Sequence, residues 1–366
     1  MKIVHVETGR HLYGGALQVV YLLRGLRKQY PNVQSVLVCP PGSAIAHAAQ
    51  DCAHRIVPMP MSGDLDVGFV FRLKRVLQQE RPNILHLHSR RGADIWGGIA
   101  GRLCNIPTLL TRRVDNSEAR SWVAVKYRMY DHIAAISNGI RDVLLNQGLG
   151  PGKVTCVHSA TDTDHYHPGG DRAWLNEEFG LPSGNVVVGI IAQLIDRKGH
   201  RFLFDALPDL VKSHPKLRVL ICGKGPIETQ LRSQVARLSL DESVIFAGFR
   251  SDMDRILPCL DLVVHPALIE GLGVSLLQAA ACEVPIIASN AGGIPEVVQH
   301  EHNGLLVPSG NSKALQRAMD RLIVDGDLRR RMGKNGRALV REQFSIAQMT
   351  AGNHRIYQGL MAESAS

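Results

Sequence analysis

The segment Glu270–Val298 combines an acid, two glycines and an apolar helical pattern within a few residues. Glu270 stands just before Gly271 and Gly273, and Gln278 follows inside the predicted helix. The free N–H groups at the start of such a helix attract anions, each contact being worth about 0.3–1 kcal/mol. Glu270 could accept hydrogen bonds from a polyol, and Gln278 could bond a second pair of hydroxyl groups. In the alternative interpretation, Glu270 only complements the helix dipole and Gln278 is a surface amide.

Two further loops in the second half of the chain could contact the same ligand. A buried strand runs into a polar loop that carries Arg197 and Lys198 and then into a helix. A diphosphate there would meet two cations and oriented N–H groups. Another predicted strand is followed by Gly223 and Lys224, where a flat ring could lie against the backbone.

The first predicted strand is followed by a loop in which Gly14 and Gly15 precede a helical pattern. Glycines at such a turn let the backbone approach a ligand closely, although an ordinary tight turn would have the same sequence. The loop has neither the dinucleotide-binding spacing of glycines nor the P-loop spacing, which disfavours both of these classes of site.

His86 and His88 are two residues apart on a predicted strand, so their side chains point to the same face of the sheet. Metal ligation is one interpretation, but no third ligand is apparent in the sequence. We therefore favour a polar strand end that lines a ligand cleft.

Four arginines follow adjacent predicted strands. Arg90 and Arg91 come after one strand, and Arg112 and Arg113 end the next. Guanidinium groups bind phosphate and carboxylate oxygens through paired hydrogen bonds. The four arginines predict a positive rim that holds an anionic ligand, and solvated surface arginines are the alternative.

The elements that must position these residues are short β-branched runs separated by helical patterns, which indicates parallel sheets with helices on both faces. In the first half the predicted strands are Lys2–Thr8, Ser35–Cys39, Asn83–His88, Thr108–Thr111, His132–Ser137 and Lys153–Ser159. In the second half they are Val186–Leu194, Leu217–Cys222, Ser243–Phe249, Leu262–Pro266, Pro285–Ser289 and Asn303–Val307.

Two such sets of strands predict an α/β chain of two doubly wound, Rossmann-like domains that face a cleft. We expect the boundary in the turn-rich stretch Tyr166–Asp171, which gives domains at 1–168 and 169–345. The final segment, 346–366, contains a helix that could pack back on the first domain. In such folds the ligands bind at the carboxyl ends of the strands.

Composition limits the class of protein. The chain has 366 residues, of which 45% are hydrophobic and 20% are charged, as expected for a globular protein of two domains. The sequence has no apolar run long enough for a membrane span and no signal-peptide pattern, so we expect a cytoplasmic protein. The seven cysteines are scattered and form no C-x-x-C pair, which disfavours disulfides and structural zinc.

The formal net charge of +9 lies almost wholly in the first half, where residues 1–170 contain 20 Lys and Arg against 12 Asp and Glu. A basic half could face a phosphorylated substrate, an anionic lipid surface or a nucleic acid, or could simply be a charged surface. The absence of an aromatic-rich basic motif argues against nucleic acid.

With these residues in view, the sequence resembles the GT-B glycosyltransferases, and more narrowly family 4, over nearly its whole length. The motifs that carry the resemblance are Gly14-Gly15, Lys198-Gly199, Gly223-Lys224-Gly225-Pro226 and the block Glu270–Val298. A softer resemblance to bacterial enzymes of lipopolysaccharide-core and surface-glycan assembly lies in Thr111–Asn116, Ala192–His200 and His265–Ala280.

The resemblance implies residue roles. Lys198 would neutralise the diphosphate leaving group, and Glu270 would lie near the donor sugar as the first acid of the E-x7-E motif. The implied catalytic residues are Lys198, Glu270, Arg113 and Arg197. The implied donor-binding residues are Gly14, Gly15, Gln193, Gly223, Lys224, Gly271, Leu272, Gly273, Val274, Ser275 and Gln278. The acceptor would be bound by His88, Arg90, Arg91 and Arg112.

The sequence departs from the family pattern at three positions. Arg113 stands where the family usually has a histidine, and Gln193 stands where it usually has an arginine, a charge that Arg197 could replace. Gln278 replaces the second acid, which usually binds the ribose. Hydrogen bonds to charged groups contribute about 1.5–3 kcal/mol against about 1 kcal/mol for neutral ones, so we expect donor binding to survive with an amide there.

The resemblance implies transfer of a sugar from a nucleotide diphosphate sugar to a hydroxyl of an anionic cell-envelope glycan or lipid-linked acceptor. Anomeric configuration would be retained, with no metal or cofactor, by a cytoplasmic protein in peripheral contact with the inner face of the plasma membrane. The alternatives are a GT-B nucleotide-sugar epimerase and a non-catalytic protein that binds nucleotide sugars or glycans.

Overall fold

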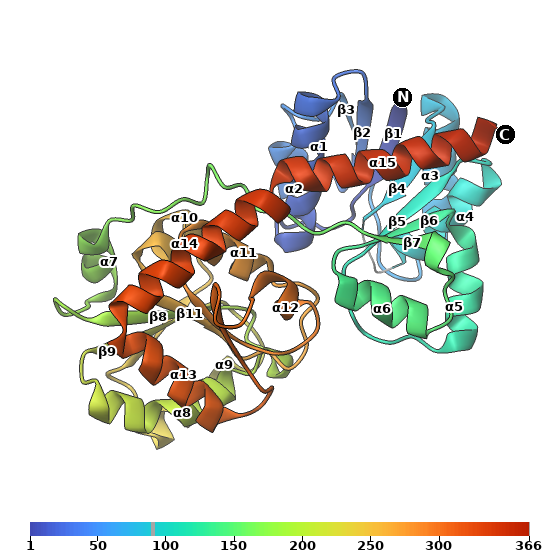
Figure 1. The fold of residues 1–366 in the computed structure, drawn as a ribbon. Helices are drawn as coiled ribbons and strands as arrows, with labels where there is room; N and C mark the ends of the chain where they lie inside the picture. Colours follow the sequence, from blue (N-terminus) through green and yellow to red (C-terminus); the bar gives the residue numbers. More distant parts are fainter. Residues whose placement is uncertain (89–91, 366) are drawn as a thin grey trace. The chain divides into compact units, whose positions relative to one another are not determined.

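The computed structural model describes residues 1–88 and 92–365 and divides the chain into two compact units. The first unit comprises Met1–Ala160 together with the final helix, α15 (Ile346–Ala365), and the second comprises Thr161–Ser345. Each unit is a parallel sheet covered by helices (Figure 1), which confirms the predicted fold class.

The described part of the first unit forms a seven-stranded parallel sheet in the order β3-β2-β1-β4-β5-β6-β7. Its strands are β1 (Lys2–Val6), β2 (Gln34–Cys39), β3 (Arg55–Pro58), β4 (Ile84–Leu87), β5 (Thr108–Arg112), β6 (His132–Ala135) and β7 (Val154–Cys156). Its helices are α1 (Gly14–Gln29), α2 (Ala44–Ala48), α3 (Gly68–Glu80), α4 (Ala93–Leu103), α5 (Arg120–Lys126) and α6 (Asn138–Asn146), with short 3-10 turns at Tyr127–Met129 and Pro151–Lys153.

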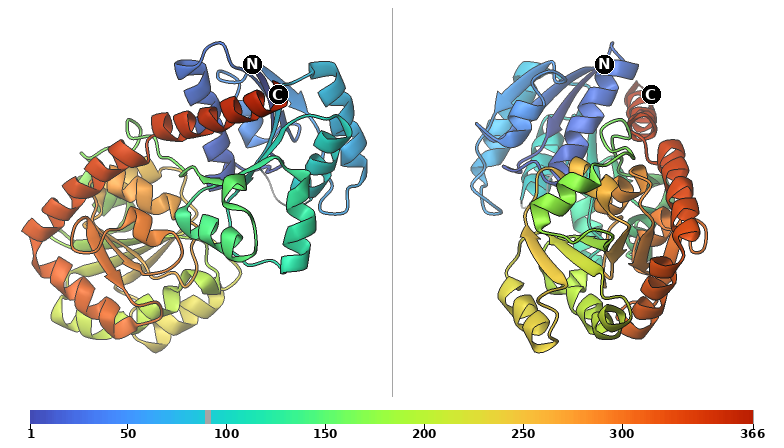
Figure 2. Two further views of the ribbon diagram at one scale, coloured as in Figure 1. Left: turned by 45° about the vertical axis from the view of Figure 1, so that its right-hand side comes forward. Right: turned by 90° about the vertical axis from the view of Figure 1, so that its left-hand side faces the viewer.

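Helix α15 packs against α1 on one face of this sheet (Figures 1 and 2). The apolar face of α1, including Leu22 and Leu26, meets Tyr357 and Leu360 of α15 in a shared core. Tyr357 is fully buried. The final segment therefore completes the core of the first unit.

The second unit has a six-stranded parallel sheet in the order β10-β9-β8-β11-β12-β13. Its strands are β8 (Val186–Ile191), β9 (Leu217–Cys222), β10 (Val244–Gly248), β11 (Leu262–His265), β12 (Ile286–Ser289) and β13 (Gly304–Val307). Its helices are α7 (Arg172–Phe179), α8 (His200–Ser213), α9 (Glu228–Arg237), α10 (Met253–Ile256), α11 (Val274–Ala281), α12 (Ile294–Val297), α13 (Ser312–Val324) and α14 (Gly326–Gln343), with 3-10 turns at Asp196–Lys198 and Leu257–Cys259.

Helix α8 packs against α9 and α13, whereas α11 packs against α14. The order of the strands reverses beside β1 in the first unit and beside β8 in the second. Loops that leave the carboxyl ends of neighbouring strands diverge at such a reversal and leave room for a ligand. In the second unit, the strands that meet there are β8 and β11.

All of the predicted strands are present, with ends that differ by a few residues. Strand β3 was not predicted. It has four residues, contains Arg55 and Pro58, and pairs only with β2 at the edge of the sheet, so it lacks the long apolar run of a central strand. An edge position is also where a strand tolerates proline.

The units divide at Ala160, somewhat before the expected boundary at 168. Arg337 of α14 donates hydrogen bonds to the carbonyl oxygens of Thr163 and Tyr166, which ties this connecting stretch to the second unit. In the described part of the chain, no helix has the length and hydropathy needed to cross a membrane.

Replacing Gly25 by alanine should separate α1 from α15. A Cβ at Gly25 would lie 2.0 Å from Thr350 Oγ1 and 3.1 Å from Ile346 Cγ2 of α15. Overpacking of this kind costs about 1–3 kcal/mol, so we expect a lower thermal midpoint by circular dichroism. The control is Gly359→Ala on α15, where a Cβ meets nothing within 4 Å and alanine favours the helix. A midpoint in Gly25→Ala at or above that of the control would contradict the packing.

Candidate functional site

Lys198 and Glu270 meet at the carboxyl ends of β8 and β11, where the strand order of the second sheet reverses. Lys198 Nζ donates a hydrogen bond to Glu270 Oε2 and forms an ion pair with it. His265, the last residue of β11, places Nε2 at 2.7 Å from the same oxygen. The two charged side chains are 13% and 14% exposed, so the pair is shielded but reachable.

The carboxyl group of Glu270 is held in its ionised form. Burial alone would raise its pKa, but the hydrogen bond from His265 and the charges of His265 and Lys198 outweigh burial and lower the pKa to about 2. Because an ionised carboxylate only accepts hydrogen bonds, His265 Nε2 donates to it. Glu270 therefore remains an acceptor at neutral pH.

The loop after β8 lies close to Glu270 because it is hydrogen-bonded to, and packed against, the loop after β11. Leu268 N donates to the carbonyl oxygen of Arg197 at 2.8 Å. Gly199 has φ +70°, and a Cβ there would lie 2.0 Å from the carbonyl oxygen of Pro266. Only glycine fits this left-handed turn at this distance. The contact places Lys198, which precedes Gly199, over β11.

The glycines of the segment Glu270–Val298 fix the positions of Glu270 and of the start of α11. Gly293, farther along the same segment, donates its N–H to the carbonyl oxygen of Glu270 at 3.0 Å and so holds the backbone of the acid in place. Gly273 has φ +92° and precedes the first residue of α11, Val274. Gln278 lies half-buried within α11, and Leu272 is buried. The turn from Gly271 to Ser275 thus leads directly from Glu270 into a helix N-terminus.

Two histidines of this site were not predicted from the sequence as functional residues. His265 lies within the predicted strand Leu262–Pro266, and His200 ends the segment Ala192–His200, but neither was assigned a role. His200 is buried, and among the described residues neither of its ring nitrogens has a hydrogen-bond partner. Burial, reinforced by the charges of His265 and Lys198, lowers the pKa of His200 to about 4, so its ring is neutral at pH 7. Their positions beside Lys198 and Glu270 in sequence were the available signal.

The other predicted donor-binding residues of the second unit lie on the same strand ends. Gln193, Arg197 and Lys224 are exposed. Leu194 N donates to the carbonyl oxygen of Lys224, which joins the loops that follow β8 and β9, and Gly223 packs against the carbonyl oxygen of Ala192. In the part of the chain that the structure describes, Arg197 forms no ion pair, so it does not share the contact between Lys198 and Glu270.

In the first unit, the structure brings Gly15, Arg113 and His88 together. Gly14 and Gly15 begin α1, and a Cβ at Gly15 would lie 3.7 Å from Arg113 Cδ. Arg113 Nη2 lies 3.5 Å from His88 Nδ1. His88 is only 3% exposed, so it lies behind Arg113 rather than on an open rim.

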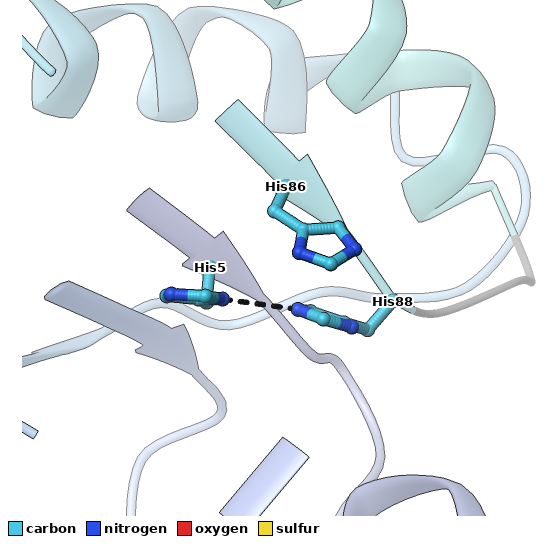
Figure 3. Close-up of side chains that lie close together, drawn as sticks. All are labelled: His5, His86 and His88. Carbon is cyan, nitrogen blue, oxygen red and sulfur yellow. Dashed lines mark hydrogen bonds between the residues drawn. The ribbon is translucent and has the colours of Figure 1, made fainter. Parts of the chain in front are cut away.

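His5 on β1, His86 on β4 and His88 directly after β4 form a buried cluster (Figure 3). The sequence showed two of these histidines and no third ligand, and the structure supplies His5. His5 Nδ1 lies 3.1 Å from His88 Nε2. His86 bonds to Tyr357 Oη through Nδ1 and to Thr111 Oγ1 through Nε2, both at 2.7 Å.

Burial keeps this histidine cluster uncharged. It lowers the pKa of His5 to about 3 and, with help from the neighbouring rings and Arg113, lowers the pKa values of His86 and His88 well below 6.5. Neutral imidazoles ligate transition metals, and one nitrogen from each ring lies within 4.8 Å of the others. Both nitrogens of His86 are already hydrogen-bonded, and the charge of Arg113 opposes a cation, so this arrangement fits a hydrogen-bonded network better than a metal site.

Arg112 departs from its expected position on an acceptor-binding rim. Its side chain is 3% exposed and forms an ion pair with Glu118 at 3.3 Å. It also donates to the carbonyl oxygen of Asn116. Strand β5 directs Arg112 and Arg113 to opposite faces of the sheet, so only Arg113 lies beside His88. The other two arginines of the expected rim, Arg90 and Arg91, lie outside the described residues.

Both halves of the chain match models of known protein families. Residues 171–339 match the model described as "Glycosyl transferases group 1", and residues 13–165 match "Glycosyltransferase Family 4". A glycosyltransferase from Rickettsia africae has the same fold, with a TM-score of 0.86, 19% identity and coverage of 98% of both chains. The chain belongs to the GT-B glycosyltransferases of family 4. As such, it is a transferase that acts on sugar donors.

Other relatives extend over most of this glycosyltransferase. It is 24% identical to the N-acetyl-alpha-D-glucosaminyl L-malate synthase of Bacillus anthracis, over 99% of this chain and 94% of the relative. It is 23% identical to an alpha-1,3-galactosyltransferase of Escherichia coli that uses UDP-Gal and GlcNAc-diphosphoundecaprenol, over 77% of each chain. Anabaena HepE, solved with UDP, has a TM-score of 0.85 at 20% identity, with coverage of 98% of this chain and 100% of HepE.

Acid should remove the stabilising effect of the Glu270 carboxylate. Its folded pKa of about 2 lies below the ordinary value of 4.5, so this contribution is present above about pH 4.5 and is lost as the pH falls toward 2. The shift corresponds to at most about 3 kcal/mol. We expect Glu270→Gln to have a lower thermal midpoint than wild type at pH 7, with a difference that shrinks at pH 3.

The control for this experiment is Glu228→Gln, which removes an exposed pair with Arg232 on α9. An exposed pair contributes about 0–1 kcal/mol, so its midpoint should stay close to that of wild type. A Glu270→Gln difference that is the same at pH 7 and pH 3 would contradict the depressed pKa.

Proposed function

We propose that this glycosyltransferase moves a sugar from a nucleoside diphosphate sugar to a hydroxyl of an anionic glycan or lipid-linked acceptor of the cell envelope, with retention of configuration. The observation that carries the proposal is the contact between Lys198 and Glu270 at the strand reversal of the second sheet. It puts a cation for a leaving diphosphate next to a carboxylate for sugar hydroxyls, beside the start of α11.

Departure of the diphosphate is the difficult step of such a transfer. Lys198 would stabilise the negative charge that develops on the leaving oxygens, with the exposed Arg197 as a second cation nearby. Glu270 would hold the sugar through hydrogen bonds that its carboxylate accepts. In the retaining mechanism we propose, the acceptor attacks from the side of the departing diphosphate, and a leaving phosphate oxygen takes the proton of the acceptor hydroxyl.

The same cations support a reaction without a divalent metal or other cofactor. A metal in such a reaction neutralises diphosphate charge, and Lys198 and Arg197 can do so directly. Gln278 would bond the ribose of the donor. The nucleotide in the donor is supported by two relatives, since HepE binds UDP and the Escherichia coli enzyme uses UDP-Gal.

An anionic acceptor is supported by the positive charge of the first half of the chain and by the names of two relatives, whose acceptors are L-malate and a diphosphoundecaprenol. For a lipid-linked acceptor, the protein would contact the membrane peripherally. Leu65, Val67 and Phe71, at and before the start of α3, are 91%, 52% and 69% exposed. Lys74 and Arg75 follow on the same helix and could meet anionic headgroups.

Replacement of Lys198 by alanine should abolish measurable transfer from nucleotide sugars to a cell-envelope extract. Loss of one group that stabilises transition-state charge lowers kcat by about 100- to 1,000-fold. The control is Lys212→Ala, which removes an exposed lysine from α8 of the same unit and should leave the rate unchanged. Transfer at the wild-type rate by Lys198→Ala would overturn the proposed role, and conversion of the donor alone would indicate an epimerase.

Replacing Leu65 and Phe71 together by serine should reduce binding to vesicles that contain phosphatidylglycerol. Burial of each side chain is worth about 1.5–3 kcal/mol, so affinity should fall by more than about tenfold in a sedimentation assay. The control is Val324→Ser in the second unit, where Val324 is 71% exposed. Equal binding by the double variant and the control would contradict membrane contact through α3.

A further inference from the structure

A small cavity lies within the first unit, where β4, β5 and the segment after β7 meet α1 and α15. It has a volume of about 20 Å³. A single water molecule needs at least about 10–15 Å³, so the cavity accepts one or two oxygen atoms of a ligand. The polar residues in its lining are Gln18, His88, Thr111, Arg113, His158, Ser159 and Asn353.

Arg113 brings a positive charge to this cavity without a counter-ion. In the described residues, no carboxylate forms an ion pair with Arg113, and Nε has no hydrogen-bond partner. Arg113 Nη2 lies 3.5 Å from His88 Nδ1. Burial lowers the pKa of Arg113, and the charge of Glu7 only partly opposes this effect.

The neighbouring Arg112 has a structural role, and its contacts can be compared with those of Arg113. Arg112 is buried, paired with Glu118 and bonded to the carbonyl oxygen of Asn116. Glu118 also accepts hydrogen bonds from Lys126 and Tyr127, so Arg112 is neutralised within a network, although its Nε, like that of Arg113, has no partner among the described residues. Removing charge from water without a partner is costly, and the cost falls when an anion is bound. Arg113 has the charge of Arg112 but lacks such a network.

The guanidinium of Arg113 is also held in place. Arginine only donates hydrogen bonds, so His88 Nδ1 accepts, and the proton of this neutral ring is on Nε2, which donates to His5 Nδ1. The buried histidine cluster therefore supports Arg113 from behind without neutralising it. Ser159 also lines the cavity, and its Oγ, which has no hydrogen-bond partner in the described part of the chain, offers a second donor.

We infer that the Arg113 cavity is a subsite for an oxyanion of the acceptor, and that a carboxylate occupies it. This inference rests on the proposed function, because it assigns the acid of the acceptor to a particular residue. The volume favours the planar head of a carboxylate over the bulkier phosphate. Arg113 would act as a residue that determines specificity for acidic acceptors, with Ser159 as a second hydrogen-bond donor.

The test is a titration of the full chain with small anions, in which binding is monitored by nuclear magnetic resonance. Sodium acetate, sodium phosphate and sodium chloride are added at equal ionic strength, without any donor or turnover. The signals are the Arg113 Nε–H group and the backbone amides of Gly15 and Ser159. We expect acetate to give saturable shifts at all three, phosphate to bind at least about tenfold more weakly, and chloride to give no saturable change.

The variants separate a site from a general charge effect. Arg113→Gln should abolish the saturable shifts at Gly15 and Ser159, and Arg113→Lys should weaken them, because an ammonium lacks the paired donors of a guanidinium. Arg27→Gln removes an exposed arginine from α1 and should respond like wild type. Arg113→Lys retains the charge and serves as the test if Arg113→Gln fails to fold.

Equal responses to acetate and chloride, or saturable acetate shifts that persist in both Arg113 variants, would overturn the subsite. Saturation by phosphate but not acetate would overturn the assignment of a carboxylate. Because no transfer is measured, the titration can fail while transfer from a nucleotide sugar still occurs, and it can succeed in a protein that transfers nothing.

Discussion

The shielded contact between Lys198 and Glu270 is the interaction on which the proposed site of the second unit depends. Two opposite charges in a shielded site stabilise each other, whereas either one alone would carry the cost of lost hydration. The chain brings them together through Gly199, which packs on the carbonyl oxygen of Pro266, and Gly293, which holds the carbonyl of Glu270. The pair lies at the strand reversal between β8 and β11, the place where ligands bind in open sheets of this kind.

The first unit distributes charge differently. Its histidine cluster is neutral and hydrogen-bonded, Arg112 is neutralised by Glu118, and Arg113 alone of these groups has a charge without a partner beside a cavity. In the second unit, a carboxylate already accompanies the cation, so the proposed diphosphate would have to compete with Glu270 for Lys198. In the first, Arg113 is available to an anion from the start. This difference suits the two proposed ligands. The donor would be held largely by backbone N–H groups, and the acceptor would be selected by the contact of its carboxylate with Arg113.

The sequence predicted the elements and residues whose signals are local. Apolar runs located every central strand, and the glycine loops indicated the strand ends at which Lys198 and Glu270 meet. Spacing could not reveal pairings between distant elements. The sequence therefore did not show that His5, on another strand, contacts His88 and adds a third histidine to the cluster. It also did not show that Arg112 forms an ion pair with Glu118 and so is not part of the expected rim. Strand β3 was missed because an edge strand of four residues has too few apolar positions.

The central claim is that the contact between Lys198 and Glu270 forms the site of a leaving diphosphate. Calorimetric titration of UDP, GDP and ADP into wild type, Lys198→Ala and Gln278→Glu tests it most directly. We predict that wild type binds at least one of these nucleotides. Lys198→Ala should lose about 10- to 100-fold in affinity, as expected for a charged hydrogen bond, while Gln278→Glu binds equally or more tightly. Equal affinity in Lys198→Ala, or no binding of any nucleoside diphosphate to wild type, would contradict the claim.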